Sequence, residues 1–279
     1  VEAEAKRGYD GRFGPGLPAI SDGQMLFMLN GVKKLKEGSG RMAIIQNGSS
    51  LFTGDAGSGA SEIRRYLIHG DFVEAIVQLP TDLFYNTGIS TYIWVLTKGK
   101  PMHRSGWVQL IDASKCFVKR RKNIGSKRVD LSDACIDLIL QAYEGFENQT
   151  YTNGDLVVES KVFENDFFGF TKVTVETAQT DANGKPLLKK GKKLPVKGAT
   201  DSEIIPLSDD IDAYMEKNVL PYNPLAYIDP AKDKIGYEVP FTRLFYKFEA
   251  PESSASIFED IKALEAKETV LMKELFGNA

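Results

Sequence analysis

Cysteine and histidine are scarce in this sequence, with two of each among 279 residues. The two cysteines, Cys116 and Cys135, suit a reducing compartment and are too few to bind a metal cluster by themselves. Because His69 and His103 are the only histidines, a histidine-rich site is excluded too. We therefore expect a cytoplasmic protein with no metal site.

Long apolar runs and a surplus of positive charge are missing as well. No run approaches the roughly 20 apolar residues that a membrane helix needs, so we expect no membrane partner. The net charge of −3 argues against a general attraction to nucleic acid, so any contact with DNA must come from a local basic patch. The length allows one large domain or two modest ones.

Three short apolar runs near the start of the chain predict an α/β sheet. Residues 42–45 (MAII), 72–79 (FVEAIVQL) and 91–96 (TYIWVL) have the length and composition of strands buried on both faces. Residues 62–68, between the first two runs, have helical spacing. The link at residues 81–90 is too short for a crossover helix, so the last two strands should be antiparallel neighbours.

Two helices and one more strand are expected around these runs. Ser21 or Asp22 should cap a helix over residues 23–36, and residues 107–111 (WVQLI) are a fourth strand candidate. Ser132 should cap a second helix of about three turns. The inward face predicted for that helix consists of Cys135, Ile136, Ile139, Leu140 and Tyr143.

Two glycine-rich segments have alternative explanations. Residues 8–18 (GYDGRFGPGLP) hold four glycines and two prolines, so they are either a functional loop or a frayed terminus. The turn at residues 54–59 lacks the Gly-Lys-Ser/Thr ending of a phosphate-binding loop, which disfavours a nucleoside triphosphate site. Ser58 or Ser61 as the cap of the following helix explains that turn more simply.

A cluster of cations follows the fourth strand candidate. Seven lysines and arginines lie between residues 115 and 128, and no acidic residue occurs between Asp112 and Asp130. The cluster is either a solvated loop or a contact for phosphates. Its members are Lys115, Lys119, Arg120, Arg121, Lys122, Lys127 and Arg128.

A polar segment divides the chain. Residues 177–203 include six lysines between Lys185 and Lys197, which is typical of a hairpin tip or a flexible linker. We therefore expect three parts. They are residues 1–172, a linker or hairpin at residues 173–205, and a C-terminal region at residues 206–279.

The last helix, predicted for residues 256–276, has a heptad pattern with one polar interruption at Glu268. About three heptads are marginal for an isolated helix, so this helix should dock, either on its own domain or on a partner chain. The apolar positions of the pattern are Ile257, Ile261, Leu264, Leu271 and Leu275.

Several of these segments resemble one family. They are residues 22–24 (DGQ), 41–52 (RMAIIQNGSSLF) and above all 79–96 (LPTDLFYNTGISTYIWVL), which is a long and specific run. The family is the modification (M) subunit of type I restriction–modification systems, an adenine-specific DNA methyltransferase. The resemblance covers most of residues 5–172 and 201–279. Shorter matches are residues 63–64, 121–137 and 239–242.

The resemblance implies a fold for this chain and implies which part of the subunit the chain represents. It implies the back half of a Rossmann-like methyltransferase sheet, whose last strands include an antiparallel hairpin, followed by a mostly helical C-terminal region. The family's glycine-rich motif for the donor S-adenosylmethionine and its Asn-Pro-Pro-aromatic catalytic motif do not occur in this sequence. We therefore expect the C-terminal portion of the subunit, which begins shortly after the catalytic motif. It should have no catalytic residue, bind no donor and be inactive alone.

The family's substrate suggests roles for individual residues. An adenine amino group cannot be reached inside a duplex, so the base is flipped out and held by stacking. By resemblance Phe84 stacks on the base, with Tyr85 as second choice, and the alternative is that Phe84 is a core residue. The target-base pocket would comprise Phe84, Tyr85, Asn86, Thr87 and Gly88. The DNA contacts would be Arg12, Phe13, Lys119, Arg120, Arg121 and Lys122.

The resemblance also implies partners. The family assembles two M subunits with one specificity subunit, which chooses the DNA sequence, and with a restriction subunit. The heptad helix should pack on the specificity subunit. Two alternatives remain: a non-catalytic assembly or DNA-contact module, and an unrelated α/β binding domain.

Overall fold

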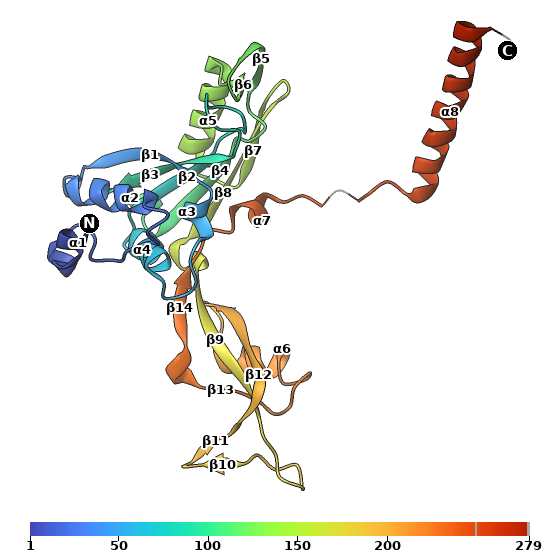
Figure 1. The fold of residues 1–279 in the computed structure, drawn as a ribbon. Helices are drawn as coiled ribbons and strands as arrows, with labels where there is room; N and C mark the ends of the chain where they lie inside the picture. Colours follow the sequence, from blue (N-terminus) through green and yellow to red (C-terminus); the bar gives the residue numbers. More distant parts are fainter. Residues whose placement is uncertain (249, 278–279) are drawn as a thin grey trace. The chain divides into compact units, whose positions relative to one another are not determined.

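The computed structural model describes residues 1–248 and 250–277, which form two compact units that divide between Phe241 and Thr242 (Figure 1). The first unit contains the sheets and the second contains the long C-terminal helix. No helix within the described ranges combines the length and the apolar character needed to cross a membrane.

The first unit is built on a six-stranded mixed sheet with the order β1-β3-β2-β4-β8-β7 (Figure 1). Strand β3 pairs antiparallel with both β1 and β2, and β2 pairs parallel with β4. The predicted α/β class and the antiparallel pairing of the second and third runs are thus confirmed. The strands are β1 (Arg41–Asn47), β2 (Val73–Gln78), β3 (Thr91–Thr97), β4 (Trp107–Asp112), β7 (Gln149–Asn153) and β8 (Leu156–Glu164).

The central strands are buried, as predicted, but β1 is not. In β2 five of the six residues are buried, because β3 and β4 flank it and helices cover it. In β1 only Gln46 is buried, and Ile45 is 49% exposed. The expectation that β1 is buried on both faces was wrong, since this strand lies at the sheet edge in the described chain.

Helices before β2 pack beside β1 and beside one another. Ser58 caps α4 by accepting a hydrogen bond from the Ser61 amide, which confirms the simpler explanation of the glycine-rich turn. On α4, Arg64 is buried and donates to the carbonyl oxygens of Thr53 at 2.9 Å and Tyr237 at 2.6 Å. Burial lowers the pKa of Arg64 to about 10. The helices are α1 (Glu2–Ala5), η1 (Gly8–Asp10), α2 (Gln24–Lys34), α3 (Ser49–Phe52) and α4 (Gly59–His69).

Helix α5 (Asp133–Gly145) packs on β4, β7 and β8. Ser132 caps it as predicted, and both cysteines lie in its core cluster. Its buried face is rotated relative to the predicted one, because Ile136 and Leu140 are exposed while Leu138 and Ala142 are buried. The predicted face was wrong at those two positions, because at about 100° per residue they lie on the side of Cys135 that faces away from Leu138 and Ala142.

After β8 and the turn η3 (Asn165–Phe168) the chain forms an arm around β9 (Gly169–Ala178), which crosses the expected boundary at residues 172–173 (Figure 1). Three strands pair antiparallel with β9, and α6 packs on the resulting sheet through Met215. Residues 173–205 therefore contain most of a long hairpin. The arm comprises β12 (Pro195–Pro206), β13 (Ala226–Ile228), β14 (Lys234–Tyr237), α6 (Ile211–Asn218), η4 (Pro230–Lys232), β10 (Leu188–Lys189) and β11 (Lys192–Lys193).

The second unit begins within α7 (Phe241–Phe245) and contains α8 (Ser254–Phe276). Ser253 caps α8 by accepting a hydrogen bond from the Ser256 amide. No residue of α8 is buried within the described unit. Most helical stability in proteins comes from the packing of an amphipathic face, and α8 has no such packing within the described unit.

Candidate nucleic-acid interface

The carboxyl ends of three strands define one edge of the central sheet. Strands β1, β2 and β4 run in the same direction, because β1 and β2 are both antiparallel to β3 and β2 is parallel to β4. They end at Asn47, Gln78 and Asp112. Ligands of open α/β sheets bind outside the carboxyl ends of the strands, so the loops at this edge are the first candidates for a site.

One of these loops, residues 79–90, links β2 to β3 and carries the predicted target-base pocket. Its base is closed by a 2.9 Å hydrogen bond from the Leu79 amide to the Thr91 carbonyl. Leu79 and Leu83 are buried in a small cluster with Val129, and Phe84 packs against the same cluster. The loop is therefore anchored from within and has a defined conformation.

A second loop at this edge is a β-hairpin formed by β5 (Val118–Ile124) and β6 (Lys127–Asp130), and it holds the first loop in place. The amides of Ser126 and Arg128 each donate a 2.8 Å hydrogen bond, to the carbonyls of Tyr85 and Asp82 respectively. Val129 of β6 adds the apolar contact described above. The hairpin, which we call the basic hairpin, and the loop of residues 79–90 thus form one surface.

The basic hairpin carries more positive charge than its single carboxylate can neutralise. Asp130 pairs with Arg120 and, at 2.8 Å, with Lys127. The hydrogen bond from Lys127 and the charge of Arg120 lower the pKa of Asp130. Lys119, Arg121 and Lys122 are exposed and form no ion pair within the described residues. Of the four predicted phosphate contacts on this hairpin, Arg120 is therefore already paired.

The two aromatic residues of the loop differ in exposure. Phe84 is half-buried, and its backbone bridges to Thr87 across the loop tip. Tyr85 is 66% exposed, and the atoms of its ring lie against Gly125 at the turn of the basic hairpin. Asn86 and Gly88 are exposed as well. Tyr85 therefore lies directly against the basic hairpin, and Phe84 packs on the apolar cluster that joins the loop to this hairpin.

Arg12 and Phe13 lie elsewhere. Arg12 pairs with Glu4 of α1 at 3.3 Å and donates to Asn30 of α2 at 3.0 Å. Phe13 lines an apolar hollow of about 410 Å³ together with Leu26 and other residues of α2. Within the described residues these contacts do not include residues 79–90 or the basic hairpin, so the structure does not bring this predicted pair to the other candidates.

A polar network at the end of β1 was not predicted from the sequence. Gln24 donates to Asp22 at 2.9 Å and to Asn47 at 2.8 Å, and Ser49 donates to Asp22 at 2.7 Å. The hydrogen bond from Ser49 lowers the pKa of Asp22. Asp22 was predicted as a possible helix cap, but Gly23 holds that position without a side-chain bond. The break after β1 at Asn47 was the available signal.

This network lies beside the loop of residues 79–90. Asn47 lies directly opposite Thr91 in the pairing of β1 with β3, and Thr91 is the first residue after the loop. The side-chain oxygen of Thr91 is buried and has no hydrogen-bond partner within the described residues. Polar groups from three segments therefore converge at the carboxyl edge.

The glycine-rich turn at residues 54–59 has a structural role. Asp55 pairs with Lys172 at 2.9 Å, and the Gly57 amide donates to the carbonyl of Ile235 at 3.1 Å. The hydrogen bond from Lys172 lowers the pKa of Asp55. The turn is therefore joined to the arm, and its amide and carboxylate groups are not directed at a ligand. It does not fit the adenosyl or phosphate group of a cofactor.

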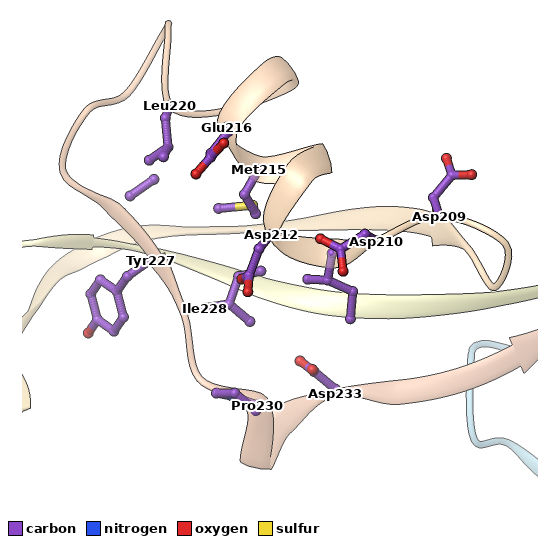
Figure 2. Close-up of a pocket in the computed structure, with 12 residues that line it drawn as sticks. Asp209, Asp210, Asp212, Met215, Glu216, Leu220, Tyr227, Ile228, Pro230 and Asp233 are labelled. Atoms are coloured by element: carbon purple, nitrogen blue, oxygen red, sulfur yellow. The ribbon is translucent and has the colours of Figure 1, made fainter.

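The arm contains an acidic hollow of about 710 Å³ between α6 and the segment that leads into β14 (Figure 2). Asp212 and Asp233 turn their carboxylates into it from opposite sides (Figure 2). Burial, followed by the charge of Asp229, raises the pKa of Asp233. The remaining acidic residues that line the hollow are Asp209, Asp210 and Glu216. Such a surface repels phosphate groups, so the base of the arm is not part of a nucleic-acid interface.

The predicted docking residues of α8 are all exposed within the described unit. Ile257 and Ile261 are the least exposed, at 46% and 47%, and Leu275 is the most exposed, at 75%. The apolar surface of the helix extends beyond the predicted heptad positions. The further exposed residues are Phe258, Val270, Met272 and Phe276.

The chain matches the family model described as N-6 DNA Methylase over residues 2–183. It is 32% identical over 108 residues to the type I restriction enzyme MjaVII methylase subunit of Methanocaldococcus jannaschii, a match that covers 39% of this chain and 18% of that protein. It is 27% identical over 212 residues to the HindI methylase subunit of Haemophilus influenzae, covering 75% of this chain and 46% of that protein. The chain thus spans less than half the length of these relatives.

Solved structures give a similar result. The type I restriction–modification methyltransferase subunit from Streptococcus thermophilus is 28% identical, with a TM-score of 0.49. That match covers 60% of this chain and 32% of the other.

Proposed function

Because the chain belongs to the N-6 DNA methylase family, we propose that it is part of the modification subunit of a cytoplasmic type I restriction–modification system. In that subunit it holds the DNA and the target base while the exocyclic amino group of an adenine is methylated. One observation supports this role above the others. The loop of residues 79–90 and the basic hairpin form one surface at the carboxyl edge of β1, β2 and β4.

The loop provides the aromatic face that an extrahelical base requires. Phe84 is our first candidate for stacking and Tyr85 our second. Their backbones are held by the Phe84–Thr87 bridge and by the hydrogen bond from Ser126, so a ring can meet the base without first being ordered. Stacking of a base on an aromatic side chain contributes about 1–3 kcal/mol, which offsets part of the cost of removing the base from the duplex.

The basic hairpin provides the phosphate contacts. Lys119, Arg121 and Lys122 are exposed cations without an acidic partner in the described chain. Contacts of this kind position a protein on the duplex and carry no sequence information. The choice of sequence would therefore belong to a partner, the specificity subunit.

The methyl donor, S-adenosylmethionine, would be held by residues outside this chain. When bound it supplies the methyl group that the adenine amino nitrogen accepts. The glycine-rich turn at residues 54–59 does not fit it, because this turn is joined to the arm through Asp55 and Gly57. This chain would instead orient the base and exclude water from one side of it.

Helix α8 would dock on the specificity subunit, because its heptad positions are exposed and apolar. A second modification subunit and a restriction subunit complete the proposed assembly. The alternative function is a non-catalytic assembly or DNA-contact module. Weak DNA binding with no donor binding, even when the missing half of the subunit is supplied, would favour that alternative.

Complementation tests the proposal. The chain is co-expressed with the specificity subunit and with the N-terminal fragment of a related modification subunit that carries the donor and catalytic motifs. Transfer of labelled methyl groups to DNA is then measured. We expect transfer, and a fall of about tenfold or more for Phe84→Ala, because the base loses its stacking partner. Phe84→Tyr should retain activity, and Tyr85→Ala tests the second candidate.

The matched control is Phe117→Ala, because Phe117 packs against the same apolar cluster as Phe84. If Phe84 only packs, the two alanine variants should lose activity equally, and the stacking role fails. A soluble complex that binds DNA but transfers no methyl group would favour the assembly module.

A further inference from the structure

The tip of the arm is a two-stranded ribbon formed by β10 and β11 (Figure 1). Its residues 185–197 lie just beyond the segment 2–183 that matches the family model.

The ribbon carries a high density of positive charge. No acidic residue occurs in residues 182–200, although the chain as a whole has a net charge of −3. All six lysines of the ribbon are exposed, and within the described residues none of them forms an ion pair. We call this set the lysine tip. Its members are Lys185, Lys189, Lys190, Lys192, Lys193 and Lys197.

Two of these lysines occupy positions that oppose folding of the free hairpin. Lys189 lies directly opposite Lys192 in the β10–β11 pairing, and like charges at such positions repel each other. Neither lysine forms an ion pair with a carboxylate in the described part of the chain. A polyanion that binds the tip would remove this penalty.

The turn gives independent support. Lys190 and Gly191 form it with φ of +50° and +78°, the pattern of a type I′ turn, which favours Asn, Asp or Gly at its first position. A lysine there is strained. Lys190 thus adds a cation at the apex of the ribbon, at a position where asparagine would cause less backbone strain.

The chemistry of the tip selects the type of polyanion. A two-stranded ribbon fits the major groove of B-form DNA. No aromatic residue lies in residues 182–200, and the neighbouring ring of Tyr227 lies under the Lys193 ammonium group, 5.2 Å from its centroid. The tip therefore lacks the open stacking platform of a single-strand binder. Lysine is a point charge suited to phosphates and reads bases less well than arginine or asparagine. The acidic hollow at the base of the arm keeps phosphates away from that end (Figure 2).

We propose that the lysine tip binds the phosphate backbone of duplex DNA without reading its sequence, as a second DNA contact separate from the loop and the basic hairpin. The contact adds affinity that depends strongly on salt. It is independent of base flipping, so it is measured without methyl transfer.

The test uses the full chain and a fluorescent duplex of arbitrary sequence, with anisotropy recorded between about 50 and 200 mM salt. The variant Lys189→Gln, Lys190→Gln, Lys192→Gln removes three charges from the tip. Each lost phosphate contact lowers the slope of log K against log salt by about 0.9, so the slope should fall by about 2–3. Affinity at the lowest salt should drop about tenfold or more.

Two further variants make the result specific. Lys33→Gln, Lys34→Gln, Lys36→Gln removes the same charge from the end of α2 and should leave the slope nearly unchanged. Substituting Lys189, Lys190 and Lys192 by arginine should retain it. An unchanged slope in the glutamine variant would overturn the proposal, as would an equal loss in the α2 variant.

Two other results separate this proposal from alternatives. If polyglutamate binds through the tip and duplex DNA does not, the tip docks an acidic protein and the proposal fails. The variant Lys119→Gln, Arg121→Gln, Lys122→Gln tests the basic hairpin separately. A salt slope that responds only to the basic hairpin would leave the proposed function intact and refute the role of the lysine tip.

Discussion

At the scale of single residues, Gly125 is the point where the basic hairpin meets the loop of residues 79–90. Its φ is +58°, and a Cβ atom there would lie 2.5 Å from the carbonyl oxygen of Tyr85 and 3.0 Å from its ring. No side chain fits without moving the loop. The close approach explains why a glycine is needed at this turn.

We therefore predict that Gly125→Ala destabilises the protein by about 2–3 kcal/mol, because strain in the left-handed region adds about 1–2 kcal/mol to the displacement of Tyr85. Unfolding in denaturant measures the loss. Hydrogen exchange at the Ser126 amide, which donates to Tyr85, should accelerate. Gly154→Ala is the control, since Gly154 has a φ of +60° with nothing within 4 Å. An equal loss in both variants would show that the loop contact contributes nothing.

Individual residues also differ in how far their roles could be predicted from the sequence. The aromatic residues Phe84 and Tyr85 were found because they belong to a long, specific run. The pairing of Arg120 with Asp130 could not be predicted, because these two residues meet only when β5 and β6 form a hairpin. The isolation of Arg12 from the loop has the same origin: its partners Glu4 and Asn30 are set by tertiary packing.

At the scale of elements, apolar runs predicted the buried strands well, and the short link between β2 and β3 predicted their antiparallel pairing. The basic hairpin was missed as a hairpin, because β5 reads VKRRKNI and has no apolar alternation. Strands β7 and β9 alternate partly polar residues as well. Hydrogen bonding to neighbouring strands, and not apolar alternation, makes these segments extended. Strand β5 pairs with β6, β7 pairs with β8, and β9 pairs with β12, β13 and β14.

Helix α8 is the element whose role depends most on a partner. Leu264→Asp with Leu271→Asp places charges in the heptad seam. Co-purification with the specificity subunit should weaken by more than about tenfold, because buried apolar anchors dominate such interfaces. Size-exclusion chromatography of the co-expressed subunits measures the effect.

The control for α8 is Ala263→Asp with Ala266→Asp, which lie three residues apart on the face opposite the seam. That variant has the same added charge and should still co-purify. If both variants co-purify as well as the unchanged chain, α8 does not dock through its heptad positions.

At the scale of the whole molecule, the segment 2–183 that matches the N-6 DNA methylase family contains all six strands of the central sheet. The chain covers less than half of its relatives, and β1 is an exposed edge strand in the described residues. Hydrogen bonds within this chain nevertheless join the loop of residues 79–90 to the basic hairpin at one edge of the sheet. The proposed function therefore depends on one contact, between the loop of residues 79–90 and the flipped adenine.

Photochemical cross-linking tests that claim most directly. In the complemented assembly, a duplex carries 5-iodouracil in place of the target adenine, and irradiation joins the base to an aromatic ring stacked on it. Mass spectrometry then identifies the attached peptide. The account predicts attachment at Phe84, or at Tyr85 as the second candidate, and loss of the Phe84 product in Phe84→Ala. Attachment only outside residues 79–90, in a complex that still binds the duplex, would contradict it.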